Sequence, residues 1–273
     1  MSINLLGKFW HKTLRQPFTL KRTFDTGEGD PVIFLHGIGR TASVWQHVIE
    51  GLSDSALRLV AFDLLGFGAS PKPQWLEYNV DQHASAVIAG IERLGVSQPV
   101  ILVGHSMGCL VSVRVARRRP DLVKHLVLYE MPLYEGLPET KRYKLRLDLY
   151  RKFYEKVIAY GPTFDDKKKM RMVERFGRKV IGFEVTPETW LPFIKSLENT
   201  IMKQAAVEDI QEIDTPMDAI YGTFDMFVIR GNLQQTIGTN SDHIVSHKLR
   251  VGHVISVRAS RFLVERIKSA VVG

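Results

Sequence analysis

Short apolar runs alternate with amphipathic segments along the first half of the chain. The runs have the length and the β-branched content of buried strands, and they cover residues 31–35, 57–63, 99–103 and 122–129. Apolar side chains at helical spacing occupy the stretches between them, at residues 43–52, at 79–94 and after the third run to about Arg119. Regular succession of strand and helix predicts parallel strands joined by right-handed crossovers.

Apolar alternation also marks the segment before the first buried run. Residues 18–23 alternate weakly and lead into Asp-Thr-Gly-Glu-Gly-Asp at 25–30, which is a turn signal. This pattern predicts a hairpin at the edge of the sheet.

The rhythm changes after Pro132. From residue 133 to about residue 204 the pattern is helical and amphipathic, without a convincing strand. Strand-like runs return at residues 217–221 and 244–251, and a last helix is predicted over about 254–270.

These elements predict an α/β fold with a mostly parallel, doubly wound sheet and an inserted helical cap. We assign residues 1–132 to the first part of the core, 133–204 to the cap and 205–273 to the second part of the core. A cap inserted at this point is expected to lie over the carboxyl ends of the strands, where open α/β sheets bind ligands.

Composition narrows the class of protein. The chain has 273 residues, 45% of them hydrophobic and 24% charged, which is ordinary for a globular protein. A single cysteine, Cys109, excludes an intramolecular disulfide framework and a cysteine-rich zinc site, and we expect it to be a buried structural thiol. We predict no metal and no cofactor.

Charge is concentrated in one stretch. The net charge is +8, and residues 139–203 hold 16 Lys and Arg against 9 Asp and Glu. Binding of nucleic acid or of an anionic membrane would explain such an excess, but so would the solvated face of amphipathic helices. No nucleic-acid motif accompanies the charge, so we predict the solvated face and no nucleic-acid partner.

The first 20 residues have no long apolar segment of the kind that signal peptides carry. They do form a short basic amphipathic segment, which leaves weak association with a membrane surface open. No run reaches the roughly 18 apolar residues that span a bilayer. We predict a cytoplasmic protein without stable membrane insertion, whose oligomeric state the sequence does not define.

The chemistry-bearing motif is Gly104-His105-Ser106-Met107-Gly108, between a predicted strand and a predicted helix. Gly-x-Ser-x-Gly arises by chance in glycine-containing loops, but a strand before it and a helix after it favour a nucleophile elbow. In such a turn the serine has a strained backbone, and the two glycines remove Cβ atoms that would collide. The serine then lies at a helix N-terminus, which favours a developing oxyanion.

Together with this elbow, four further segments resemble the motifs of capped α/β-hydrolases with a serine nucleophile. They are His36-Gly37-Ile38-Gly39 (oxyanion loop), Asp63 to Ser70 (Asp-x-x-Gly-x-Gly-x-Ser turn), Gly222 to Asp225 (acid turn) and Gly252-His253 (histidine loop). The resemblance covers residues 32–271 except the cap. It implies the α/β-hydrolase fold.

The family's order of serine, acid and histidine implies that Ser106 is the nucleophile, Asp225 the acid and His253 the base. Asp225 and His253 each follow a predicted strand, so both should reach the sheet edge of Ser106 as well. Glu130 is a rival acid because it closes the strand at 122–129; we favour Asp225. By the same resemblance, His36 and His105 are expected to form structural hydrogen bonds. His243 and His247 fall before or within the last predicted strand rather than after it, so we expect them to be bystanders.

The resemblance also implies an oxyanion hole built from the backbone N–H groups of Met107 and Ile38, with Gly39 as an alternative to Ile38. A serine at the elbow argues for attack on a carbonyl carbon and for an acyl-enzyme. We therefore predict a serine esterase (carboxylesterase) that cleaves a small-molecule ester.

Other readings of the same triad stay open: a carbon–carbon bond hydrolase, a lactonase, a thioesterase, a peptidase, or a receptor with slow turnover. The cap should select the substrate, and part of its apolar set is expected to face the serine. That set is Tyr134, Leu137, Phe153, Tyr154, Phe164, Phe183, Trp190 and Phe193.

Overall fold

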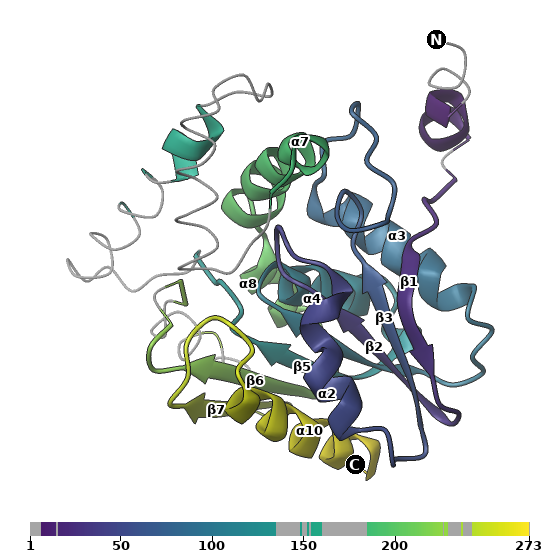
Figure 1. Ribbon diagram of the computed structural model, residues 1–273, viewed down its shortest axis with the longest axis vertical. Coiled ribbons are helices and arrows are strands. Elements are labelled where there is room, and N and C mark those ends of the chain that lie inside the picture. The colour runs from purple at the N-terminus through teal and green to yellow at the C-terminus, as the bar shows by residue number, and fades with distance from the viewer. Residues whose placement is uncertain are drawn as a thin grey trace.

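The computed structural model describes residues 7–14, 16–134, 148, 152, 154–159, 185–225, 227–228, 236 and 242–272. These residues form a seven-stranded sheet with helices on both faces (Figure 1). The strands are β1 (Lys21–Thr26), β2 (Asp30–Leu35), β3 (Leu57–Asp63), β4 (Val100–His105), β5 (Val123–Tyr129), β6 (Met217–Gly222) and β7 (Ile244–Leu249).

The strand order is β1-β3-β2-β4-β5-β6-β7, and every neighbouring pair is parallel except β1 and β3. The predicted α/β fold with a mostly parallel sheet is confirmed. The predicted hairpin is wrong, because β1 pairs antiparallel with β3 and not with the following strand. Both sides of β2 are occupied by β3 and β4, so the chain must cross to the outer side of β3 to add an edge strand.

Two helical layers enclose the sheet. One apolar core lies between the sheet and α3 (Val80–Glu92), α4 (Met107–Arg118) and α8 (Ala206–Gln211). The other lies beneath α2 (Gln46–Gly51) and α10 (Val257–Val272). The helix predicted at 43–52 is divided into a 3-10 turn (Ala42–Trp45) and α2.

An inserted helical region lies between β5 and β6. Its described part contains α7 (Pro187–Ser196) and a π-helical turn (Leu197–Met202). Thr186 caps α7, because its side chain and that of Thr189 each accept the other residue's backbone N–H. Residues 135–147 and 160–184 of the predicted cap lie outside the described residues, as does most of the basic stretch at 139–203.

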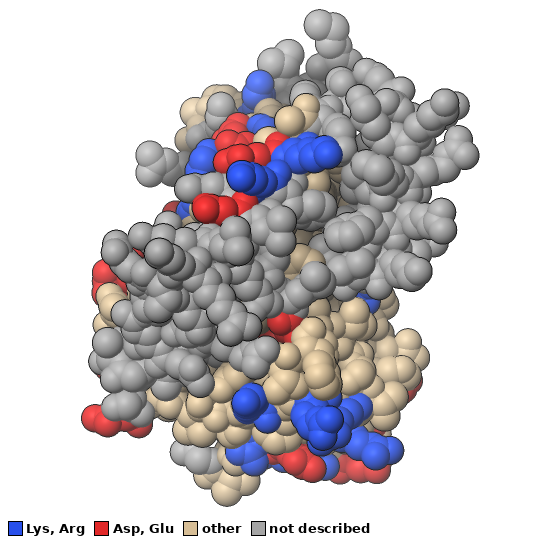
Figure 2. Space-filling model, turned by 90° about the vertical axis from the view of Figure 1, so that its left-hand side faces the viewer, with Lys and Arg blue, Asp and Glu red and all other residues tan. Residues whose placement is uncertain are grey.

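Surface charge on the described part is mixed. Figure 2 shows Lys and Arg side chains interspersed with Asp and Glu on the face it displays, rather than one continuous basic surface among the residues described there. Within the described ranges, no helix is long and apolar enough to cross a membrane.

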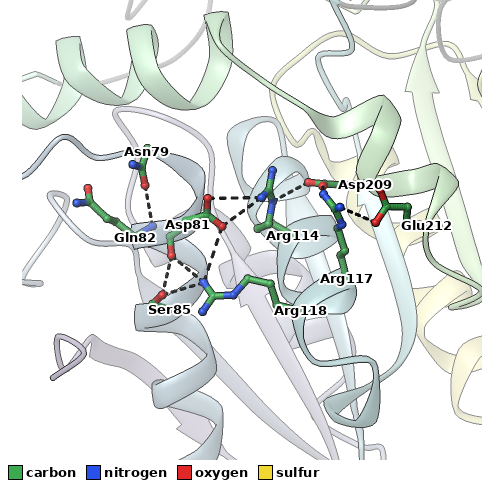
Figure 3. Close-up of polar contacts among 9 residues, drawn as sticks. All are labelled: Asn79, Asp81, Gln82, Ser85, Arg114, Arg117, Arg118, Asp209 and Glu212. Atoms are coloured by element: carbon green, nitrogen blue, oxygen red, sulfur yellow. Dashed lines mark hydrogen bonds and ion pairs between the residues drawn. The ribbon is translucent and has the colours of Figure 1, made fainter. Parts of the chain in front are cut away.

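A charged network ties α8 to the helix that follows the elbow (Figure 3). Asp209 on α8 is buried and accepts from Arg114 Nε at 2.8 Å and from Arg117 Nη1 at 2.6 Å, both on α4. Arg114 also contacts Asp81 on α3 at 3.2 Å. The sequence pattern did not predict α8, since a helix of six residues has too few turns to show a period and owes its place to these long-range ion pairs.

We expect Asp209→Asn to lower the free energy of unfolding by about 2–3 kcal/mol, because it leaves two guanidinium groups without their buried counter-charge. The loss falls below that of a fully buried pair because the Arg117 side chain is 32% exposed. Urea unfolding measures it. Glu212→Gln is the matched control: it removes an exposed partner of Arg117 and should cost under about 1 kcal/mol. Equal losses in the two variants would contradict the assignment.

Candidate active site

Ser106 occupies the sharp turn between β4 and α4. Its backbone has φ 52° and ψ −120°, in the left-handed half of conformational space that L-residues rarely adopt. Its N–H donates to the Tyr129 carbonyl at 3.0 Å, which fixes the turn to the end of β5. The absence of a side chain at Gly108 is required, because a Cβ there would collide with the Leu35 carbonyl oxygen.

His253 reaches Ser106 from the loop after β7. The hydroxyl of Tyr129 donates to the Gly252 carbonyl at 2.8 Å, and the His105 ring donates through Nε2 to the His253 carbonyl at 2.9 Å. These bonds hold the loop so that His253 Nε2 lies 3.1 Å from Ser106 Oγ and Nδ1 lies 2.7 Å from Asp225 Oδ2. All three side chains are buried.

Asp225 lies in the turn after β6. Its Oδ1 accepts the Phe227 N–H at 2.6 Å, so the carboxylate has a donor on each oxygen. Burial by itself would raise the pKa of Asp225, but His253 and these donors outweigh it and lower that pKa to about 2. The group is therefore ionised at neutral pH and can hold the imidazole with Nδ1–H toward it.

The rival acid, Glu130, comes directly after β5 and is fully buried. Burial and the charge of Asp225 raise the pKa of Glu130 to about 10. It makes no hydrogen bond to His253 within the described structure; the carboxylate at Nδ1 is that of Asp225.

Both residues expected to supply oxyanion-hole N–H groups adjoin Ser106. Ile38 lines the same cavity as Ser106 and His253. Met107 is the first residue of α4, where an N–H has no acceptor within the helix. Gly39, the alternative to Ile38, lines a neighbouring polar cavity together with Arg40 and Lys72.

Buried polar groups fix the loop that carries Ile38. His36 accepts the Leu64 N–H through Nε2 at 2.8 Å and donates through Nδ1 to the Gly37 carbonyl at 2.7 Å. The Asp63 carboxylate accepts the N–H groups of Ala42 at 2.8 Å and Ala69 at 2.9 Å. His36 and His105 thus have the structural hydrogen bonds expected of them.

An apolar cavity opens onto Ser106. Besides Ile38 and His253 it is lined by Pro132, Tyr134, Tyr154, Val157, Phe193, Leu197, Ile201 and Phe227. Tyr134, Tyr154 and Phe193 belong to the predicted apolar set, while Trp190 stacks on Phe193 with ring centroids 6.1 Å apart. Leu137, Phe153, Phe164 and Phe183 lie outside the described residues.

Sequence reasoning missed Leu197 and Ile201. A signal was present, since Phe193, Leu197 and Ile201 are spaced by four residues and so share one face of α7 and the turn that follows it. Phe227 gave no such signal, because it lies in a loop.

His243 and His247 show a His-x-x-x-His spacing, which on a helix can place two metal ligands side by side. His247, however, lies on β7 and its Nε2 contacts Asp218 Oδ1 at 2.5 Å, while His125 Nε2 contacts Oδ2 at 2.9 Å. Neither His243 nor His247 is hydrogen-bonded to Ser106, Asp225 or His253 in the described structure. No group of three His, Cys, Asp or Glu within the described ranges is arranged to hold a metal ion.

Comparison with known proteins agrees with this architecture. A family model described as alpha/beta hydrolase fold matches residues 30–162. The solved structure of a thermophilic esterase from Thermogutta terrifontis superposes with a TM-score of 0.67 at 20% identity, covering 92% of this chain and 93% of that one. The chain has the α/β-hydrolase fold.

Curated relatives match over shorter stretches of this chain. The 2-hydroxymuconate semialdehyde hydrolase of Pseudomonas sp. (strain CF600) is 28% identical over 169 residues, which are 59% of this chain and 53% of that protein. Probable lysophospholipase BODYGUARD 4 of Arabidopsis thaliana is 34% identical over 109 residues, which are 40% of this chain and 26% of that protein. The chain thus spans about half the length of the first relative and about a quarter of the second.

Three histidines in the described part of the chain are buried in neutral form. Burial lowers the pKa of His36 to about 4 and those of His83 and His105 to about 3. The unfolded chain, with histidine pKa values near 6.5, binds more protons below that pH. Stability from these groups is therefore fully present above pH 6.5 and is lost as the pH falls through their folded pKa values of about 4 and about 3.

His83 tests this pH dependence because it lies away from Ser106, with Nε2 at 3.2 Å from Ser196 Oγ. The free energy of unfolding of the parent protein should fall between pH 7.5 and pH 4.5. We expect this fall to be roughly 2 kcal/mol smaller in His83→Gln. Urea unfolding at the two pH values gives the difference. His47→Gln, at an exposed position, should leave the parent's pH dependence unchanged. An unchanged dependence in His83→Gln would refute the assignment.

Proposed function

We propose that this chain is a serine hydrolase that cleaves a carboxylic ester through an acyl-enzyme on Ser106. The observation that carries the proposal is the unbroken hydrogen-bonded sequence from Ser106 Oγ through His253 to Asp225. The hydrolase names of the matched relatives support the reaction class.

Each residue has one role in this mechanism. His253 Nε2 takes the proton of Ser106 Oγ as that oxygen attacks the carbonyl carbon, and Asp225 stabilises the imidazolium that forms. The N–H groups of Ile38 and Met107 bind the oxyanion; one such donor is worth about 2.7–4 kcal/mol of transition-state stabilisation. His253 then gives its proton to the leaving alcohol. In the second half, water loses a proton to His253 and attacks the acyl carbonyl carbon. His253 then returns that proton to Ser106 Oγ as the bond between Oγ and the acyl carbon breaks and the carboxylic acid leaves.

We further propose that residues 133–204 form a cap on a core made of residues 1–132 and 205–273, and that the cap selects a small-molecule ester with an apolar acyl group. The apolar lining of the cavity at Ser106, to which Tyr154, Phe193 and Leu197 contribute, supports this assignment.

Ser106→Ala should reduce the hydrolysis of p-nitrophenyl esters, tested from acetyl to dodecanoyl, by several orders of magnitude, because the attacking oxygen is removed. It should also abolish labelling by a fluorophosphonate. Ser112→Ala is the matched control. That serine is buried on α4, and its hydroxyl donates to the Gly108 carbonyl at 2.7 Å. Ser112→Ala should leave turnover and labelling intact.

The outcomes separate the alternatives. Labelling of Ser106 without turnover of any ester would favour another carbonyl substrate (a lactone, a thioester, a peptide or a cleavable carbon–carbon bond) or a binding role. Retained ester turnover in Ser106→Ala would refute the proposed mechanism.

Leu197→Ala should widen the cavity and raise the ratio of kcat/KM for octanoyl over butyryl ester about tenfold, since a methylene in an apolar pocket is worth about 1–3 kcal/mol. Lys195→Ala, whose side chain instead pairs with Glu77 at 2.8 Å, controls for general effects on α7. The same chain-length preference in both variants would show that this wall does not select the acyl group.

A further inference from the structure

Glu130 is a buried carboxyl that the proposed mechanism does not use. It follows β5 directly, and its N–H donates to the Ile220 carbonyl of β6 at 2.9 Å. Its φ of 55° is left-handed, a conformation that is strained in a residue other than glycine. The side chain is therefore directed by a strained backbone, and it is completely shielded from solvent.

The fold leaves room for this carboxyl. A Cβ at Gly222, the last residue of β6, would collide with Glu130 Oε1 and with the Val251 carbonyl oxygen. Neither Oε atom has a hydrogen-bond partner in strict geometry among the described residues. A buried acid in such a space needs a partner or must give up its charge.

The titratable groups that interact with Glu130 come from several surrounding elements. Asp225 in the turn after β6 has the largest effect on the pKa of Glu130, followed by Tyr129 on β5. The charge of Glu130 in turn raises the pKa of Cys109 on α4. His253 is hydrogen-bonded to Asp225 and not to Glu130 in the described structure.

Two adjacent carboxyl groups in a dry site cannot both ionise. Asp225 accepts from two donors, His253 Nδ1 and the Phe227 N–H. The Gly222 N–H and the Tyr129 hydroxyl lower the pKa of Glu130 by less than burial and Asp225 raise it. The shared negative charge therefore belongs to Asp225 and the proton to Glu130. The raised pKa of Glu130, about 10, agrees with this division.

We propose that Glu130 is a positioning residue that acts uncharged, its carboxyl O–H donating to the Asp225 carboxylate and so holding Asp225 against His253. This inference rests on the proposed serine mechanism. The two carboxyl groups interact with each other, and a hydrogen bond between them is strengthened because its acceptor is ionised. Glu130 supports the triad from behind Asp225 and never contacts the substrate.

The protonation state of Glu130 distinguishes this role from that of a charged residue beside the triad. An ionised Glu130 would stabilise the imidazolium form of His253, so that Glu130→Gln would move the acid limb of the kcat/KM profile to lower pH. An uncharged Glu130 is matched by glutamine, whose amide can donate in the same place. Glu130→Leu removes the donor and keeps the side chain apolar.

The experiment compares Glu130→Gln, Glu130→Leu and Val127→Ala on p-nitrophenyl butyrate from pH 5 to 9, with active sites counted by fluorophosphonate. Val127 is a buried β5 residue in the core beneath α10 and controls for lost stability. Glu130→Leu should lower kcat about tenfold at nearly constant KM, as for one lost charge-assisted hydrogen bond. Glu130→Gln should restore kcat to within about threefold and leave the acid limb in place.

Two results would overturn the inference. One is an acid limb shifted down by about half a pH unit or more in Glu130→Gln, which would show a charged Glu130. The other is a kcat per labelled site in Glu130→Leu equal to that of Val127→Ala, which would show a merely structural role. If no ester turns over, the pH dependence of the fluorophosphonate labelling rate gives the same comparison. Loss of labelling in Ser106→Ala tests the serine mechanism separately.

Discussion

The left-handed turn at Ser106 is the constraint on which the site depends. Strain of this kind costs about 1–3 kcal/mol and persists only where the surroundings determine the backbone fully. Here the Ser106 N–H is bonded to the end of β5, and the Ser106 carbonyl accepts the Cys109 N–H in the first turn of α4. Gly108 lets α4 approach the end of β2 closely. A central, fully paired strand is therefore a requirement of the nucleophile's position.

The same sheet edge brings the other groups together. Parallel strands end side by side, so the turns after β4, β5, β6 and β7 converge, and short polar bonds then fix each loop to its neighbour. Tyr129 and His105 do this for the histidine loop, as His36 and Asp63 do for the loop of Ile38. These groups are buried and are either neutral or paired, so at neutral pH they hold the loops of the site in fixed positions. Protonation of the buried histidines at low pH destabilises the fold.

Much of this could be predicted from the sequence. Buried parallel strands appear in the sequence as continuous apolar runs, so the predicted strand bounds agree with the observed ones to within one or two residues. The order of the motifs along the chain implied which loops meet. Two features could not be predicted, because each depends on a partner distant in sequence. Strand β1 pairs with the open edge of β3, and α8 is held by the arginines of α4. Phe227 reaches the cavity from a loop without a period.

Two carboxyl groups, Asp225 and Glu130, follow neighbouring strands, and sequence spacing does not tell them apart. The difference is local. Asp225 accepts an N–H from Phe227 in its own turn and lies opposite the imidazole of His253. Burial and the charge of Asp225 act on Glu130 and outweigh the hydrogen bonding of Tyr129 and Gly222. Hydrogen-bond donors favour the ionised form of the carboxyl group that they contact, so the negative charge lies on Asp225. One strand end thus supplies an anion and the adjacent one a neutral acid, and the pair carries a single negative charge beside the imidazole, enough to stabilise one imidazolium.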